Sequence, residues 1–337
     1  MTPITLIAQI APQRSTQYAA LADFLAPLEL QLSPLGRQLS NLRRLTLGGR
    51  GYLQFTLPEK LTPATSYELG AMAALDAFFV YHETLGGQPG PFLQPLDTEF
   101  TPAWSPDLVM TRRYRGKTNE LFTHWLCNIA RYSSDLADRP WHTLRVLDPL
   151  AGGGTTLFTA LMLGADAAGV EQDENDVRTT VTFFKQYAQQ ERVSHTVKEE
   201  RLKKVGRRWS FEIGKRKASV EQRQQCILTQ GDTAQSVQLM AGFKPHLIVT
   251  DLPYGIQHQG RLNALLSNAL PVWEALLPPS GALAFAWDAT RFSRAEMIAL
   301  VQSSCALRVL DEEPYTQFGH QVDRVIKQRE VLVARPQ

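Results

Sequence analysis

The stretch LRVLDPLAGGGTTLF, residues 144–158, decides the fold. It begins with a short apolar run that ends at Asp148, and three glycines, residues 152–154, separate this run from a helical pattern. Glycines let the backbone turn tightly and approach a ligand, and a helix start favours an anionic group. The order strand, glycine loop, helix therefore predicts a nucleoside-binding turn in a doubly wound sheet.

Strand and helix patterns alternate from this stretch to the C-terminus. Apolar runs at 165–171, 226–232, 246–251 and 282–288 predict strands with helices between them, and 306–315 and 323–335 are expected to be two antiparallel strands. Such alternation indicates a sheet covered by helices on both faces. We predict a Rossmann-like α/β fold with a seven-stranded mixed sheet.

The first hundred residues have a different pattern. Residues 15–29 and 65–83 predict amphipathic helices, and residues 44–57 predict a hairpin with a glycine-rich turn. A stretch rich in proline and glycine, residues 85–106, is expected to be a linker. The sequence thus predicts a small N-terminal α+β domain, residues 1–100, as a candidate substrate-binding part, and a larger domain, residues 101–337.

Composition sets outer limits on the function. The 337 residues are 44% hydrophobic, enough for two domains with sizeable cores. No apolar run reaches the ~18 residues of a membrane span, and the N-terminus lacks the pattern of a signal peptide. Cys127, Cys226 and Cys305 lie far apart, which favours neither a disulfide framework nor a metal site. We expect a cytoplasmic protein without a metal ion and without membrane contact.

Charge is concentrated in one segment. Residues 191–225 contain eleven lysines and arginines against five acids, a local net charge of +6, whereas the whole chain carries +2. Trp209 and Phe211 stand between these charges, a mixture that suits the backbone of RNA. The alternative is a solvated surface insertion that packs both aromatic side chains on its own domain.

Acidic residues end three successive predicted strands: Asp148, Glu171 and Asp232. An acid in the place of Glu171 suits a ribose diol. The third glycine of the dinucleotide fingerprint and the P-loop lysine are both missing, and an acid before the glycines opposes a pyrophosphate but suits the ammonium group of S-adenosylmethionine. Asp232 could lie by the adenine amino group. For any one acid, the alternative is a helix N-cap.

A fourth strand is followed by TDLPYG, residues 250–255, next to the switch point where ligands bind in such sheets. The exocyclic amine of a nucleobase is a poor nucleophile, because its lone pair is delocalised into the ring. Asp251 and the carbonyl group of Leu252 could accept hydrogen bonds from this amine. Pro253 would stiffen the turn, and Tyr254 could stack on an extruded base.

These motifs resemble those of a known family. Asp-Leu-Pro-Tyr is similar to the Asp/Asn-Pro-Pro-Tyr/Phe signature of amino-group methyltransferases that act on nucleic acid, although a leucine replaces the first proline. DPLAGGGTTL resembles their cofactor motif, and RYRGKTNELFTHWLCNIA, residues 113–130, resembles the helix that closes over the methionine end of the cofactor. This order resembles the tRNA guanine-N2 methyltransferases related to THUMP-containing enzymes, over about residues 105–335.

The resemblance implies a class I methyltransferase that uses S-adenosylmethionine and acts on RNA, with guanine N2 of tRNA as the expected target. It implies catalysis by Asp251, Leu252, Pro253 and Tyr254. The candidate cofactor-binding residues are Lys117, Thr118, Asn119, Asp148, Pro149, Gly152, Gly154, Thr155, Thr156, Glu171, Gln172, Asp232 and Thr233.

Three alternatives stay open. A DNA adenine-N6 or cytosine-N4 methyltransferase shares the motif, but no long target-recognition region follows Asp251. An RNA-binding module that has lost activity would not need Asp148, Glu171 and Asp251 intact. A protein glutamine methyltransferase usually has Asn in place of Asp251.

Overall fold

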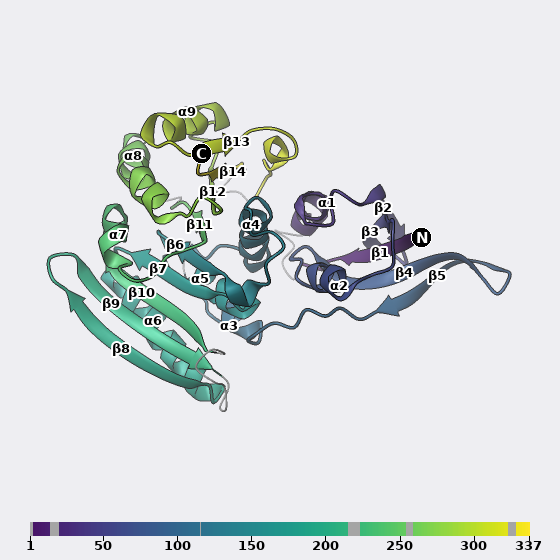
Figure 1. Ribbon diagram of the computed structural model, residues 1–337, viewed down its shortest axis with the longest axis horizontal. Coiled ribbons are helices and arrows are strands. Elements are labelled where there is room, and N and C mark those ends of the chain that lie inside the picture. Colours follow the sequence, from purple (N-terminus) through teal and green to yellow (C-terminus); the bar gives the residue numbers. More distant parts are fainter. Residues whose placement is uncertain (1–2, 14–19, 115, 215–222, 254–258, 323–327) are drawn as a thin grey trace. The chain divides into compact units, whose positions relative to one another are not determined.

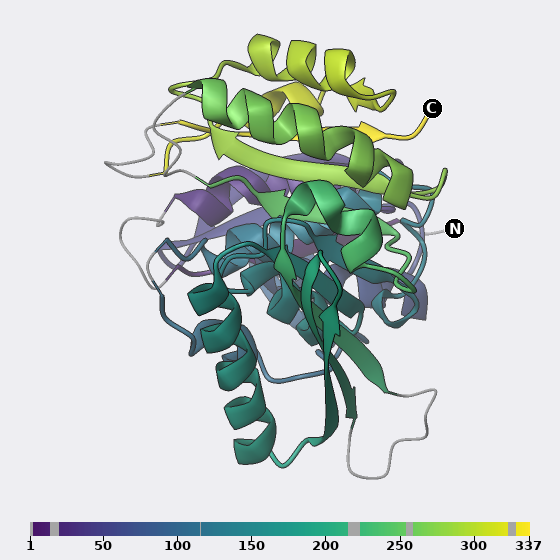
Figure 2. The same ribbon diagram turned by 90° about the vertical axis from the view of Figure 1, so that its left-hand side faces the viewer.

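The computed structural model divides the chain into two compact units, Met1–Thr101 and Pro102–Gln337. It describes residues 3–114, except 14–19, and residues 116–337, except 215–222, 254–258 and 323–327. Figure 1 labels the elements, and Figure 2 shows the same ribbon turned by 90°. No helix in the described ranges is both long and apolar enough to cross a membrane.

The N-terminal unit contains a five-stranded antiparallel sheet with the strand order β2-β3-β1-β4-β5. Leu6 and Ala8 of the central strand, together with Leu53 and Phe55 of its neighbour, are fully buried and form the core. The elements of this unit are β1 (Ile4–Ile10), α1 (Leu21–Leu32), β2 (Ser40–Leu47), β3 (Arg50–Leu57), α2 (Pro63–Gly70), β4 (Leu75–Leu85) and β5 (Gln88–Leu96).

Sequence patterns predicted this unit only in part. The hairpin of β2 and β3 is confirmed. The helix predicted over residues 65–83 is wrong in its second half, because LDAFFVYHETL forms the strand β4. Aromatic and β-branched side chains pack well on a pleated surface, and Phe78 lies buried in the sheet. The predicted linker is corrected as well, since residues 88–96 form β5, which pairs with β4.

The C-terminal unit alternates strands and helices. Its elements are α3 (Asp107–Met110), α4 (Glu120–Tyr132), β6 (Arg145–Asp148), α5 (Thr155–Leu163), β7 (Asp166–Glu171), α6 (Glu174–Gln190), β8 (Ser194–Leu202), β9 (Gly206–Gly214), β10 (Gln224–Gly231), α7 (Ser236–Leu239), β11 (Leu247–Asp251), α8 (Gln259–Leu276), β12 (Ala282–Asp288), α9 (Arg294–Ser304), β13 (Arg308–Leu310) and β14 (Arg329–Arg335).

The sheet of this unit has nine strands in the described residues, not the predicted seven. Their order is β13-β14-β12-β11-β6-β7-β10-β9-β8. The additional strands, β8 and β9, come from the basic segment, which continues the sheet beyond β10 as an antiparallel hairpin. The alternation of Trp209, Phe211 and Ile213 with polar residues favours a strand that is buried on one face. The antiparallel pairing of β13 and β14 is confirmed, but β13 spans only three residues.

Helices cover both faces of this sheet (Figures 1 and 2). On one face α7, α8 and α9 share a continuous apolar core with the strands, which includes Leu147, Ile248 and Trp273. On the other face, Phe184 of α6 packs on Phe158 of α5 and on Phe211 of β9. The strands β6 and β11 lie side by side at the point where the chain order reverses. Their carboxyl ends therefore flank the switch point of the sheet.

Candidate functional site

A cavity of about 830 Å³ lies at this switch point, within the C-terminal unit. Its walls come from the ends of β6, β7 and β11, the glycine loop, and the segment before α4. Of the residues predicted from the sequence, it is lined by Thr118, Asp148, Pro149, Gly152, Thr155, Thr156, Glu171, Gln172, Thr233, Asp251, Leu252 and Pro253. The predicted cofactor side and the predicted catalytic side thus face one space.

Glu171 ties the glycine loop to the end of β7. Its Oε2 accepts a hydrogen bond from the backbone N–H of Gly152 at 2.8 Å, and its Oε1 accepts one from Asp173 at 2.7 Å. Gly152 has a φ of +50°, and a Cβ added there would meet nothing within 4 Å. The left-handed turn at Gly152 therefore leaves open space at the cavity wall.

Gly154 has a different role from the one predicted. It also adopts a left-handed conformation, with φ +85°, but it is the N-cap residue of α5 and is not one of the residues that line the cavity. An added Cβ would lie 3.0 Å from the methyl group of Thr180 and 3.3 Å from the ring of Phe158. A larger residue there would first strain the fold. Both glycines were expected at the cofactor: Gly152 borders the cavity, whereas the contact of Gly154 stays a prediction without support from this geometry.

Asp148 ends β6 and is only 4% exposed, although its carboxyl group borders the cavity. Burial raises its pKa to about 6, and the nearby charge of Asp251 acts in the same direction. Hydrogen bonds oppose this shift, among them one from the backbone N–H of Leu150 at 3.0 Å. A cation bound in the cavity would favour the ionised carboxylate.

Asp232 behaves as the helix-cap alternative predicts. Its Oδ1 accepts a hydrogen bond from the N–H of Ala234 at 2.9 Å, at the start of a 3-10 turn. Asp232 does not line the cavity, whereas the next residue, Thr233, does. The hydroxyl oxygen of Thr233 accepts a hydrogen bond from Trp273 Nε1 at 2.9 Å. At the end of β10, Gly231 and Thr233 therefore line the cavity, and Asp232 between them does not.

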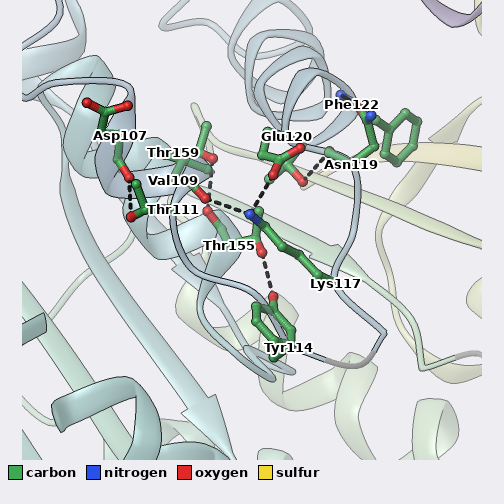
Figure 3. A network of polar contacts seen from close by, with 11 residues as sticks. Asp107, Val109, Thr111, Tyr114, Lys117, Asn119, Glu120, Phe122, Thr155 and Thr159 are labelled. Atoms are coloured by element: carbon green, nitrogen blue, oxygen red, sulfur yellow. Dashed lines mark hydrogen bonds and ion pairs between the residues drawn. The ribbon is translucent and has the colours of Figure 1, made fainter. Parts of the chain in front are cut away.

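Two of the three residues before α4 serve the local fold. Figure 3 shows Lys117 Nζ donating to the carbonyl oxygen of Val109 at 2.7 Å and pairing with Glu120. Asn119 caps α4, because its Oδ1 accepts a hydrogen bond from the N–H of Phe122 at 3.0 Å. Neither residue lines the cavity. Their predicted contact with the cofactor stays a prediction without support from this geometry.

Tyr114 is a cavity residue that the motifs did not reveal. Its hydroxyl group lies 2.5 Å from Thr155 Oγ1, at the first turn of α5 (Figure 3). The guanidinium group of Arg112 lies 5.2 Å from the centre of its ring. Burial raises the pKa of the Tyr114 hydroxyl group. Tyr114 was not among the predicted site residues, although it belongs to the motif of residues 113–130, and that position was the signal that could have indicated it.

Asp251 receives two partners from distant parts of the unit. Thr118 Oγ1 donates to Asp251 Oδ2 at 2.7 Å. Arg329 Nη2 lies 3.6 Å from the same oxygen, as an ion pair. The next residue, Leu252, is 1% exposed, and its N–H donates to the carbonyl oxygen of Ala286. Pro253 is exposed at the cavity, and Tyr254 lies outside the described residues.

The basic hairpin separates its aromatic residues from its charges. Phe211 is buried and contacts Phe184 with 4.9 Å between ring centres, and Trp209 is also buried. Both aromatic side chains therefore pack within their own unit, as the alternative predicts. Lys203, Lys204 and Arg207 are exposed at the turn and on β9.

Arg208 differs from the other basic residues of the hairpin. Its Nη1 donates to the carbonyl oxygen of Ala241 at 2.9 Å, and its Nη2 pairs with Glu200 at 3.2 Å. The carbonyl group of Ala241 follows α7, so Arg208 joins the hairpin to the end of that helix. Its side chain is a structural link.

Comparison with solved structures gives methyltransferases with low sequence identity. TrmN from Thermus thermophilus is 14% identical, with 99% of this chain and 100% of that chain covered and a TM-score of 0.46. The rRNA methyltransferase aviRa from Streptomyces viridochromogenes is 13% identical, with 69% and 91% covered and a TM-score of 0.40. A TehB-like S-adenosylmethionine-dependent methyltransferase from Corynebacterium glutamicum is 13% identical, with 58% and 80% covered and a TM-score of 0.36.

No protein-family model and no curated protein sequence matches the chain. The solved structures that it resembles include S-adenosylmethionine-dependent methyltransferases, the class that the sequence motifs also resemble.

Proposed function

We propose that this protein is an S-adenosylmethionine-dependent methyltransferase that methylates an exocyclic amine of a base in RNA. The specific target that we propose is guanine N2 in tRNA. One observation carries the proposal: Asp251 lines the same cavity as the glycine loop and Glu171. A nucleoside cofactor and a base amine can therefore meet there.

The cavity residues fit the cofactor. Open space at Gly152 allows close approach to the backbone, and the carboxylate of Glu171 lies beside it for a ribose diol. Asp148 offers a buried carboxylate to an ammonium group. When bound, S-adenosylmethionine supplies an electrophilic methyl group. Its carboxylate would lie near Thr118, while Pro149, Thr155, Thr156, Gln172 and Thr233 complete the wall.

Asp251 would act on the target amine. A carboxylate that accepts a hydrogen bond from the N–H would draw the amine toward tetrahedral geometry, so that its lone pair leaves the ring system and becomes nucleophilic. The carbonyl group of Leu252 is the second acceptor that we propose. Pro253 and Tyr254 would hold the base, with stacking on the tyrosine ring contributing roughly 1–3 kcal/mol.

The exposed lysines and arginine of the hairpin favour a polyanionic substrate. We propose RNA over DNA because, among the described residues, those after β11 form the helices and strands of the sheet and no additional long segment for reading duplex DNA. The N-terminal unit, residues 1–101, is a candidate for binding the rest of the RNA. In this proposal the C-terminal unit does the chemistry and the N-terminal unit selects the substrate.

The test is a series of variants at Asp251, assayed by single-turnover methylation of bulk tRNA from a strain that lacks the gene. Asp251→Ala should bind S-adenosylmethionine normally but lose a factor of about 10²–10³ in rate, by analogy with the loss of one oxyanion-hole donor. Asp251→Asn keeps one acceptor oxygen and should retain more activity. Asp138→Ala is the control, because Asp138 is exposed in a turn and does not line the cavity.

Mass spectrometry of nucleosides from the reacted tRNA, rRNA and DNA identifies the product. N2-methylguanosine in tRNA supports the full proposal. A methylated adenine or cytosine in DNA instead would assign the DNA alternative. Full activity of Asp251→Ala would remove the proposed catalytic role, and no methylation of any nucleic acid by the wild type would favour the inactive RNA-binding module.

A further inference from the structure

Arg329 contacts the carboxylate of Asp251 without lining the cavity. It is the first residue of β14 and is 2% exposed. Its Nη2 is 3.6 Å from Asp251 Oδ2, yet Arg329 is not one of the residues that form the cavity wall. A buried arginine therefore pairs with the proposed catalytic acid from a position outside the space for substrate.

Two elements fix the position of this guanidinium group. The ring of Phe122, in the first turn of α4, lies 4.3 Å from its centre, at cation–π distance. The backbone of Arg329 pairs with His320 through two hydrogen bonds of 2.9 and 2.8 Å. The ring of Phe122 in α4 thus contacts the guanidinium group, and the two hydrogen bonds to His320 hold the backbone of Arg329 in the strand.

Arg329 brings a positive charge to one of two neighbouring acids, Asp251. Burial raises the pKa of Asp148, and the nearby charge of Asp251 adds to this shift. Burial lowers the pKa of His320 to about 4, so this imidazole is neutral near pH 7 and adds no charge. An opposite charge close to a carboxylate favours its ionised form. Arg329 therefore favours ionised Asp251.

Arg329 and Thr118 act on the same oxygen of Asp251. Two partners on Oδ2, one from before α4 and one from β14, limit rotation of the carboxylate. The orientation of Asp251 toward the cavity is thereby set by residues far apart in the sequence.

We infer that Arg329 is a positioning residue that keeps Asp251 ionised and oriented for the target amine. This inference rests on the proposed function, because it needs Asp251 to act on the substrate. Arg329 itself does not contact the base. Its effect passes through the carboxylate, and this gives a test that separates it from a purely structural arginine.

The experiment measures single-turnover tRNA methylation at saturating S-adenosylmethionine for Arg329→Met and Arg329→Lys, each alone and combined with Asp251→Asn. Arg329→Met should lower the rate constant about 10- to 100-fold, by analogy with the loss of hydrogen-bond partners that orient metal ligands. Cofactor affinity from calorimetry should change less than about 3-fold, which is less than about 0.7 kcal/mol. Arg329→Lys, which keeps the charge, should recover part of the rate.

The double variants test whether Arg329 acts through Asp251. In the Asp251→Asn background there is no carboxylate charge to support, so Arg329→Met should have little further effect. Arg294→Met is the matched control, because Arg294 also bonds to β14, through the carbonyl oxygen of Val331, but contacts Asp311 and Glu330 instead of the cavity. It should leave the rate constant unchanged in both backgrounds.

An equal loss from Arg329→Met in both backgrounds would overturn the inference, and so would equal rates for Arg329→Lys and Arg329→Met. If Arg329→Met does not fold, the same comparison is made with Arg329→Lys in both backgrounds. Failure of the proposed function is distinguishable, because Asp251→Ala would then remain fully active whatever residue stands at position 329.

Discussion

The ring of Tyr114 lies directly on the backbone of Gly153. A Cβ added to Gly153 would be 2.3 Å from Tyr114 Cζ, closer than any real contact of this kind. The tyrosine thus occupies the volume that a side chain in the middle of the glycine loop would need. This contact couples the segment before α4 to the loop, two parts that the sequence separates by almost forty residues.

Gly153→Ala should therefore destabilise the protein by about 1–3 kcal/mol, the usual cost of overpacking. Removing the opposing ring should relieve the clash, so Gly153→Ala combined with Tyr114→Ala should cost less than the sum of the two single changes. Denaturant unfolding of the four proteins in the cycle measures this. Additive free energies of unfolding would show that Tyr114 does not lie on the loop.

Substitutions at the two left-handed glycines should have different effects. Gly152→Asn should weaken S-adenosylmethionine binding at least 10-fold with little loss of stability, because its side chain would enter the cavity and Asn tolerates this backbone conformation. Gly154→Asn should instead lower the melting temperature, because its side chain would press on Thr180 and Phe158. Calorimetry and thermal unfolding on both variants test this, and the reverse ranking would contradict the placement of the loop.

Charge reversal at the hairpin should affect substrate affinity and leave cofactor affinity unchanged. Changing Lys203, Lys204 and Arg207 to Glu removes exposed cations. Each phosphate that the variant no longer binds should flatten the log–log salt dependence of tRNA binding by roughly 0.7–0.9. Arg208 must be left intact, because it holds the end of α7. A slope equal to that of the wild type would show that the hairpin does not contact RNA.

Cofactor affinity should depend on pH through Asp148. Its pKa of about 6 in the folded protein lies above the ordinary value of 3.8, so binding of an ammonium group must release a proton below pH 6. The affinity for S-adenosylmethionine should therefore rise about 5-fold between pH 5 and pH 6, and about 2-fold more before it levels off above pH 7. Calorimetry in buffers of different ionisation enthalpy detects the released proton, and Asp148→Asn should abolish both effects.

The same shift has a consequence for the stability of the free protein. Between about pH 4 and pH 6 the folded state holds a proton on Asp148 that the unfolded chain has lost. The free energy of unfolding should therefore fall as the pH rises through this window, by about 3 kcal/mol at most for a shift of this size. Asp148→Asn should flatten the curve, and an unchanged curve would place the titrating group elsewhere.

The acids at strand ends could be predicted from the sequence because parallel strands share one edge. Asp148, Glu171 and Asp251 each end an apolar run, and the fold brings all three to one cavity. Asp232 and Asn119 could not be assigned in this way. An acid or amide after a strand or before a helix serves equally well as a cap, and only the three-dimensional structure decides between the two uses.

Contacts between distant segments could not be predicted. Arg329 stands at the start of an apolar strand, and nothing in its neighbours indicates that it lies beside Asp251. Tyr114 contacts Thr155 across a separation of 41 residues, which no local pattern indicates. The strand β4 was missed for a local reason, because its mixture of aromatic and polar residues fits helical and strand periodicities about equally.

The strand β8 is the last strand at one edge of the large sheet, with no further strand beside it in the described part of the chain. Such an edge presents backbone donors and acceptors that another polypeptide could join, as happens in fibrils. Lys198, Glu199, Glu200 and Arg201 follow one another along this edge, and both signs of charge discourage such joining. The mixed charges of β8 therefore oppose edge-to-edge association. Replacing Lys198, Glu199 and Arg201 by alanine, with Glu200 kept as the partner of Arg208, should produce aggregates in light scattering.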